Sequence, residues 1–225
     1  MTRASQLFTE TEKAHIEEAV TAAEAKTSAE IVPAVCTASG RYDRAEDIAG
    51  LWLGAILVAL AWLLLPWERS NAGSWGLSWD RVQLPAMLLG LVAGFILGAA
   101  LASRIAWLRR LFTSRKEMQD EVAVRARQIF YDQRVHHTAG CTGVLLYISL
   151  YERMAAVIAD GPVVEKLGQP AVDQLCHDLT MLLRRGTAAE ALSTVVAQAG
   201  ERLATVFPRE SSDRDELSNK LVLLA

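Results

Sequence analysis

The sequence predicts an α/β domain with layered helices and a small mixed sheet, interrupted by a two-helix transmembrane hairpin. Helix-patterned and strand-patterned segments lie on both sides of the chain's centre, and the centre holds two long apolar runs without a charged residue. The hairpin follows the first predicted strand. Residues 1–47 and 104–208 are therefore expected to fold together as one domain, followed by a tail over residues 209–225.

The two apolar runs cover residues 48–67 and 82–103. Each is long enough to cross a hydrocarbon core of about 30 Å as a helix. We expect residues 48–103 to anchor the chain in a lipid bilayer. Because an ion path needs polar groups at depth, a channel or transporter is disfavoured. A hairpin buried inside a soluble protein is the alternative, and the length of both runs and their lack of charged residues argue against it.

Charges beside the spans predict which side of the membrane the domain occupies. Seven basic residues flank the hairpin: Arg41, Arg44, Arg104, Arg109, Arg110, Arg115 and Lys116. The connecting loop carries only Arg69 and Arg81. By the positive-inside rule, both termini are expected in the cytoplasm. The first residues contain no apolar segment of the kind that marks a signal peptide. Trp67, Trp79 and Trp107 are placed to lie at the membrane interfaces.

Glycines recur at helical spacing in the spans. Gly90, Gly94 and Gly98 are four residues apart in the second span, and Gly50 and Gly54 open the first. Small residues at this spacing let helix backbones approach closely. Packing within the hairpin is the simpler interpretation. A homodimer through Gly90, Gly94 and Gly98 is the alternative.

The first half of the domain is predicted to hold one helix and one strand. Thr9 and Glu12 form a capping-box pattern that starts the helix. Residues 30–36 (EIVPAVC) follow as the strand. Because Pro33 has no N–H to donate, this strand is expected to lie at an edge or to carry a bulge. Residues 42–47 are expected as a short helix leading into the first span.

The second half begins with a long helix predicted over residues 104–133. Residues 143–149 are apolar on both faces, as in a central strand. The turn to the next strand, residues 153–159, is so short that the two strands must be antiparallel. Helices follow over residues 163–167, 170–185 and 187–207. For the tail, a docked extended segment and a frayed end are both open.

Composition narrows the function classes. The net charge of −3 gives no basic footprint for a nucleic-acid partner. Three cysteines without regular spacing fit a reducing compartment rather than a disulfide framework. His136, His137 and Cys141, with the distant Cys176 and His177, match no standard zinc spacing. The sequence also lacks the phosphate-binding, nucleophile-elbow and zinc-protease motifs of common enzyme families.

Three stretches carry a family resemblance. The opening helix continues into TSAEIVPAV (residues 27–35), and TGVLLYISLYERMAAVIADG (residues 142–161) is followed by two closing helices. These stretches resemble the TPM domain family, which is named after a thylakoid lumen protein, a photosystem protein and the MOLO receptor modulator. A bacterial branch that carries membrane spans is especially similar. The resemblance implies an α/β/α sandwich in the bacterial inner membrane.

The resemblance also implies two kinds of function. Some family members bind divalent cations and show weak phosphatase activity, whereas others are accessory or assembly factors. This chain departs from the family at two motifs. Phe8-Thr9-Glu10-Thr11-Glu12 stands where many members have paired aspartates, and Ala159-Asp160-Gly161 replaces the usual Gly-x-Gly. Most members also present the domain outside the cytoplasm.

Asp160 is the first candidate for chemistry, because it ends a predicted strand and precedes Gly161. A carboxylate there can bind a hard cation such as Ca²⁺ or Mg²⁺ through oxygen. The cation could then be held against a phosphate ester. The alternative is an Asp-Gly turn that simply leaves the sheet.

Glu30 and Arg153 each start a predicted strand. They could pair across one end of the sheet, Arg153 could hold a phosphate, and Glu30 could join Asp160 as a metal ligand. A structural ion pair or two solvated strand ends is the simpler alternative. Glu10 and Glu12 are the remaining acidic candidates, although a helix N-terminus favours acids in any case.

Two function hypotheses follow. The first is a membrane-anchored TPM-type domain that acts as a binding or accessory module for another membrane protein. The alternative is a divalent-metal-dependent phosphatase acting on phosphate monoesters, with Asp160, Arg153 and Glu30 as candidate catalytic residues. Its cofactor would be Ca²⁺ or Mg²⁺.

Overall fold

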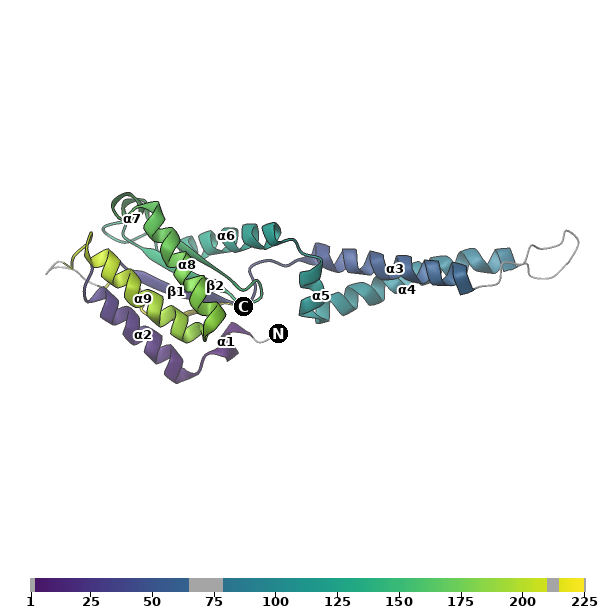
Figure 1. The fold of residues 1–225 in the computed structure, drawn as a ribbon, viewed down its shortest axis with the longest axis horizontal. Helices are drawn as coiled ribbons and strands as arrows, with labels where there is room; N and C mark the ends of the chain where they lie inside the picture. The colour runs from purple at the N-terminus through teal and green to yellow at the C-terminus, as the bar shows by residue number, and fades with distance from the viewer. Residues whose placement is uncertain (1–2, 65–78, 210–214, 225) are drawn as a thin grey trace, which may run out of the picture. The chain divides into compact units, whose positions relative to one another are not determined.

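The computed structural model describes residues 3–64, 79–209 and 215–224. The chain divides into two compact units. The first unit combines Met1–Gly40 with Lys116–Ala225 and holds the sheet, and the second, Arg41–Arg115, is a helical hairpin (Figure 1).

Among the described residues, the sheet has four strands: β1 (Ile31–Cys36), β2 (Val144–Ser149), β3 (Met154–Ala159) and β4 (Val222–Leu224). Their order is β3-β2-β1-β4. β1 runs parallel to β2 and β4, and β2 runs antiparallel to β3. The predicted small mixed sheet is therefore confirmed. The end of the tail is docked as β4.

The prediction that the strand with Pro33 lies at an edge or carries a bulge is wrong. β1 has neighbours on both sides. The carbonyl of Cys36 accepts from Leu150 on the β2 side, and the amide of Thr37 donates to Leu224 on the β4 side. Alternation along the strand turns the nitrogen of Pro33 toward β4. Because β4 starts to pair one residue further along, no strand lies opposite the missing donor.

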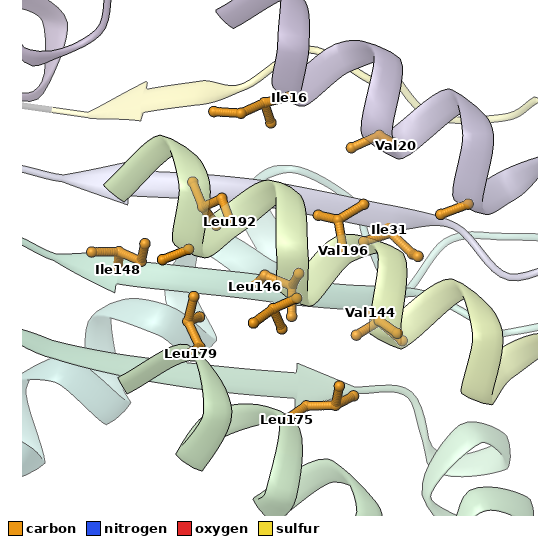
Figure 2. Close-up of a cluster of buried hydrophobic side chains, with 14 of the residues drawn as sticks. Ile16, Val20, Ile31, Val144, Leu146, Ile148, Leu175, Leu179, Leu192 and Val196 are labelled. Atoms are coloured by element: carbon orange, nitrogen blue, oxygen red, sulfur yellow. The ribbon is translucent and has the colours of Figure 1, made fainter. Parts of the chain in front are cut away.

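Helices cover both faces of the sheet, giving the predicted α/β/α sandwich (Figure 1). α2 (Glu10–Glu24), α8 (Gln169–Arg185) and α9 (Ala188–Ala204) pack on one face, and α6 (Arg115–Asp132) packs on the other. Figure 2 shows the first face, where side chains from three helices meet those of β1 and β2. The labelled residues are Ile16, Val20, Ile31, Val144, Leu146, Ile148, Leu175, Leu179, Leu192 and Val196.

Local sequence signals explain the starts of two long helices, α2 and α9. The capping box predicted for Thr9 with Glu12 is present before α2, and the sequence pattern of Thr187 with Glu190 forms a second one before α9. Each box satisfies two amides that the helix itself leaves unpaired. The remaining helices of this unit, α1 (Ala4–Leu7) and α7 (Gly161–Leu167), are short.

The single long helix predicted over residues 104–133 is wrong. The chain instead forms α5 (Ala106–Leu111) and α6, with a break at Thr113 and Ser114. Serine and threonine favour the position just before a helix, because their hydroxyls can accept from its first amides. The polar pair therefore starts a new helix instead of continuing the old one.

The hairpin consists of α3 (Asp43–Leu64) and α4 (Trp79–Arg104). Both helices are long and apolar enough to cross a membrane, over Arg44–Leu64 and Leu84–Arg104. Only 17% and 11% of their most apolar windows are buried, whereas a core helix of a soluble protein would be mostly buried. Trp67, which is expected at a membrane interface, and Arg69, one of the two basic residues of the connecting loop, lie outside the described residues.

The glycines let α3 and α4 approach closely. A Cβ atom on Gly94 would lie 2.6 Å from the Cα of Gly54, and one on Gly98 would lie 2.8 Å from the Cα of Gly50. At Gly90 the nearest atom would be the Cβ of Leu57, at 3.8 Å. Gly94 and Gly98 thus serve packing within the hairpin. A homodimer through the glycines of α4 stays a prediction, and it would have to displace these contacts.

Candidate functional site

Three carboxylates from distant parts of the chain meet at one end of the domain. Glu24 is the last residue of α2, Glu30 directly precedes β1, and Asp215 lies in the segment that leads to β4. One carboxylate oxygen of each lies within 4.8 Å of the others. We call these three residues the acidic cluster.

Glu24 is a buried member of the cluster, and only one of its two carboxylate oxygens has a hydrogen-bond partner among the described residues. The residue is only 9% exposed. Its Oε1 accepts a hydrogen bond from the amide of Ile31 at 2.9 Å. Its Oε2 is buried and has no hydrogen-bond partner among the described residues. Leaving a buried charged oxygen unpaired is costly, so this atom needs a proton or a cation.

Glu30 is held in place by the tail. It is 6% exposed, and its two oxygens accept from the amides of Glu216 at 3.1 Å and Leu217 at 3.4 Å. These bonds also place the neighbouring Asp215 beside the two glutamates. Each carboxylate oxygen keeps a second lone pair, so the bonded oxygens can still ligate an ion.

Burial dominates the electrostatics of the cluster. It raises the pKa of Glu24 to about 8, and the nearby carboxylates of Glu30 and Asp215 add to that rise. Arg209 opposes it with its positive charge, and its Nη1 donates to the main-chain oxygen of Glu24 at 3.0 Å. Burial also raises the pKa of Glu30. At neutral pH and without a cation, Glu24 therefore keeps a proton, which a bound cation would displace.

The donor set suits a hard divalent cation. Ca²⁺ and Mg²⁺ bind oxygen ligands, with carboxylates foremost among them. The three carboxylates would supply part of a coordination shell, and the orphaned Oε2 of Glu24 points to a missing positive partner. A bound cation would also lower the pKa of the ligating carboxylates.

Asp160 lies at the same end of the sheet as Glu30 but outside the acidic cluster. Its Oδ2 accepts from the amide of Gly143 at 3.0 Å, and its own amide donates to the carbonyl of Gly143 at 3.0 Å. These bonds close the end of the β2–β3 hairpin. Burial raises the pKa of Asp160. These contacts with Gly143 match the simpler alternative, an Asp-Gly turn that leaves the sheet.

The suggested pairing of Glu30 with Arg153 is wrong. Glu30 stands at the amino end of β1, which is parallel to β2. Arg153 precedes Met154, which pairs with Ser149 at the carboxyl end of β2. The two charged residues thus lie at opposite ends of the sheet. Arg153 has a φ of 54° and lines a pocket of about 540 Å³ at its own end.

The remaining sequence candidates have ordinary contacts. Glu10 forms an ion pair with Lys13 at 2.7 Å, and Glu12 belongs to the capping box of α2. The three cysteines are free. Within the described part of the chain, no group of potential ligands includes the histidines or cysteines: His136, His137, Cys141, Cys176 and His177.

Sequence reasoning missed Glu24 and Asp215. A signal for Glu24 was present, since a helix C-terminus disfavours a negative charge and this helix ends on one. Asp215 gave no such signal. It belongs to a tail that carries charges of both signs, and it joins the cluster only because the tail docks beside β1.

Comparisons with known proteins bear on the fold alone. No protein-family model and no curated protein sequence matches the chain. Among solved structures, the NMR structure of the BA42 protein from the psychrophilic bacterium Bizionia argentinensis is similar, with a TM-score of 0.57. The two proteins share 16% identity, and the match covers 100% of each chain.

Proposed function

We propose that this chain is a membrane-anchored TPM-type module that binds a divalent cation, Ca²⁺ or Mg²⁺, and serves as an accessory partner of another membrane protein. The observation that carries the proposal is the buried Oε2 of Glu24, which has no partner among the described residues and belongs to a group of three carboxylates. A cation there would join α2, β1 and the tail, and so couple its binding to the order of the domain.

The proposed location is the bacterial inner membrane, with the domain and both termini in the cytoplasm. The two apolar helices support the anchor. The excess of basic residues on the flanks of the hairpin supports the orientation. The family resemblance supports a bacterial source.

A divalent-metal-dependent phosphatase is the second candidate, and the acidic cluster is what favours it. Carboxylates that hold a cation can present it to a phosphate monoester. The residues first considered for catalysis are divided, however: Glu30 and Asp160 lie at one end of the sheet and Arg153 at the other. Release of phosphate from p-nitrophenyl phosphate, with Ca²⁺ or Mg²⁺ present, tests this candidate directly.

Calorimetric titration of the full chain in lipid nanodiscs tests cation binding. We expect saturable binding of Ca²⁺ or Mg²⁺ that is lost, or weakened at least about tenfold, in Glu24→Gln. Asp215→Asn tests the exposed member of the cluster. Glu18→Gln is the matched control, because Glu18 is an exposed glutamate on the same helix. It should bind like the wild type.

Two results would contradict the proposed cation site. One is the absence of binding by a chain whose circular dichroism and unfolding show that it is folded. The other is binding that survives Glu24→Gln but is lost in Asp160→Asn. The accessory role has a separate test: in-membrane cross-linking should yield a defined partner, and replacing residues 48–103 by an unrelated two-span hairpin should abolish that product.

A further inference from the structure

A pocket at the carboxyl end of β2 has the size and position of a small-molecule binding site. Its volume is about 540 Å³. Small-molecule pockets commonly measure about 300–1,000 Å³. Ile148 and Ser149, the last residues of β2, line it together with Leu150. In open α/β sheets, ligands bind at the carboxyl ends of the strands.

The walls are mostly apolar. Leu7 and Phe8 contribute from the segment before α2, and Leu183 contributes from the end of α8. The start of α9 completes the enclosure with Ala188 and Ala189. Such walls suit the hydrocarbon or aromatic body of a ligand.

Two guanidinium groups give the pocket its charge. Arg153 and Arg184 both line it and both are exposed, and neither guanidinium group has a hydrogen bond or ion pair with any described residue. Glu12 also lines the pocket, but its Oε2 already accepts from the amide and the hydroxyl of Thr9. Two positive charges and one negative charge leave a net charge of +1.

Arg153 stands in an unusual backbone conformation for an arginine. Its φ of 54° lies in the left-handed region, which costs non-glycine residues energy. A glycine would meet the demands of this turn more easily. A long cationic side chain at a position that favours glycine is consistent with a role of that charge in binding a ligand in the pocket.

We propose that this pocket binds a small organic carboxylate, with its apolar body between Phe8, Leu150 and Leu183 and its carboxylate on Arg153 and Arg184. Guanidinium groups bind carboxylates through paired hydrogen bonds. The net charge of +1 matches a monoanion better than a doubly charged phosphate ester. The acidic cluster lies at the other end of the sheet, so this site does not depend on the cation site.

The test uses the full chain in lipid nanodiscs and 4-phenylbutyrate as the probe. Ligand-observed NMR and calorimetry should show saturable binding with a Kd of about 1 mM or lower, beyond that of empty nanodiscs. The neutral amide of the same acid should bind at least about tenfold more weakly, because it cannot pair with the guanidinium groups as an anion.

Three variants locate the contact. Arg153→Gln or Arg184→Gln should weaken binding of 4-phenylbutyrate by about tenfold. Arg185→Gln is the matched control: Arg185 is the exposed neighbour of Arg184 and does not line the pocket. It should leave the Kd unchanged, whereas a general effect of protein charge would weaken all three variants equally. Thermal unfolding confirms that each variant is folded.

Four results would overturn the proposal. These are the absence of saturable binding by the folded wild type, equal binding of acid and amide, a Kd that is unchanged in both Arg153→Gln and Arg184→Gln, and an equal loss in Arg185→Gln. Tighter binding of phenyl phosphate than of 4-phenylbutyrate would overturn the assignment to a monoanion. None of these outcomes depends on whether Ca²⁺ or Mg²⁺ binds to the acidic cluster.

Discussion

The carboxylate of Glu24 accepts a hydrogen bond from the amide of Ile31 at 2.9 Å, and so ties the end of α2 to the start of β1. The amide of Ile31 points to the side of β1 on which β4 lies, but β4 pairs only further along the strand. Glu24 therefore takes the place of a strand partner. This role occupies one carboxylate oxygen and leaves the other for a proton or a cation.

The stability of the cation-free domain should fall as the pH rises. Folding moves the pKa of Glu24 from 4.5 to about 8, so the folded state keeps a proton that the unfolded state loses between these values. The free energy of unfolding should decrease between about pH 5 and pH 8, by at most about 1.4 kcal/mol per pH unit for this group. Urea unfolding with a chelator present, followed by circular dichroism, measures it.

Glu24→Gln provides the comparison for this pH dependence. The amide does not titrate, so the decrease should be smaller in the variant. A remainder is expected, because the pKa of Glu30 is also raised by burial and acts in the same direction. Identical slopes in the two proteins would show that Glu24 does not carry the effect.

Cation affinity should rise with pH over the same range. Below about pH 8, a cation must displace the proton of Glu24, so the Kd for Ca²⁺ or Mg²⁺ should fall by up to about tenfold per pH unit and then level off. Calorimetry in buffers of different ionisation enthalpy counts the protons released, and about one is expected. An affinity that stays constant from pH 6 to pH 8 would contradict this linkage.

In the hairpin, Gly94→Ala should be destabilising and Gly90→Ala should be tolerated. The new Cβ at Gly94 would lie 2.6 Å from the Cα of Gly54, whereas that at Gly90 would be 3.8 Å from its nearest neighbour. Forcing the helices apart should cost about 1–3 kcal/mol. Denaturation in detergent, followed by tryptophan fluorescence, reports on this unit, since all six tryptophans fall between Arg41 and Arg115. Equal stability of the two variants would argue against close helix contact at Gly94.

Deletion of residues 221–225 should destabilise the domain and promote its association. Leu221 and Leu223 pack against the core on one face of the sheet, and Val222 and Leu224 pack on the other. Without β4, part of β1 becomes an open edge that can pair with another chain. Thermal unfolding and light scattering check both effects, and Lys220→Ala, at an exposed position, should change neither. A truncated chain as stable and monomeric as the full chain would contradict the expectation.

Local signals predicted most of the elements but not their long-range partners. Thr9 with Glu12 and Thr187 with Glu190 could be recognised because a capping box acts over three residues. The order of the strands in the sheet could not be predicted in this way, since β4 is a three-residue strand from the far end of the chain. The error at Pro33 followed directly from that missing partner.

The candidate site, too, could be predicted only in part from local sequence signals. Glu30 was identified because the sequence predicted a strand start there, and it directly precedes β1, but its companions Glu24 and Asp215 come from a helix end and from the tail. Only the packed domain brings these carboxylates together. Arg153 was predicted to start a strand, but it lies in the turn just before β3, and the antiparallel course of β3 places it at the opposite end of the sheet from Glu30.

The position of β1 dictates an order of events during synthesis. This strand leaves the ribosome before the hairpin, yet both of its neighbours, β2 and β4, are translated after it. The apolar helices thus emerge while β1 still has no partner, and they can enter the bilayer before any sheet exists. Closure of the sheet on that side waits for β4. The apolar helices are therefore complete before the sheet is, and a chain without β4 would pair β1 with β2 alone and leave its other edge open.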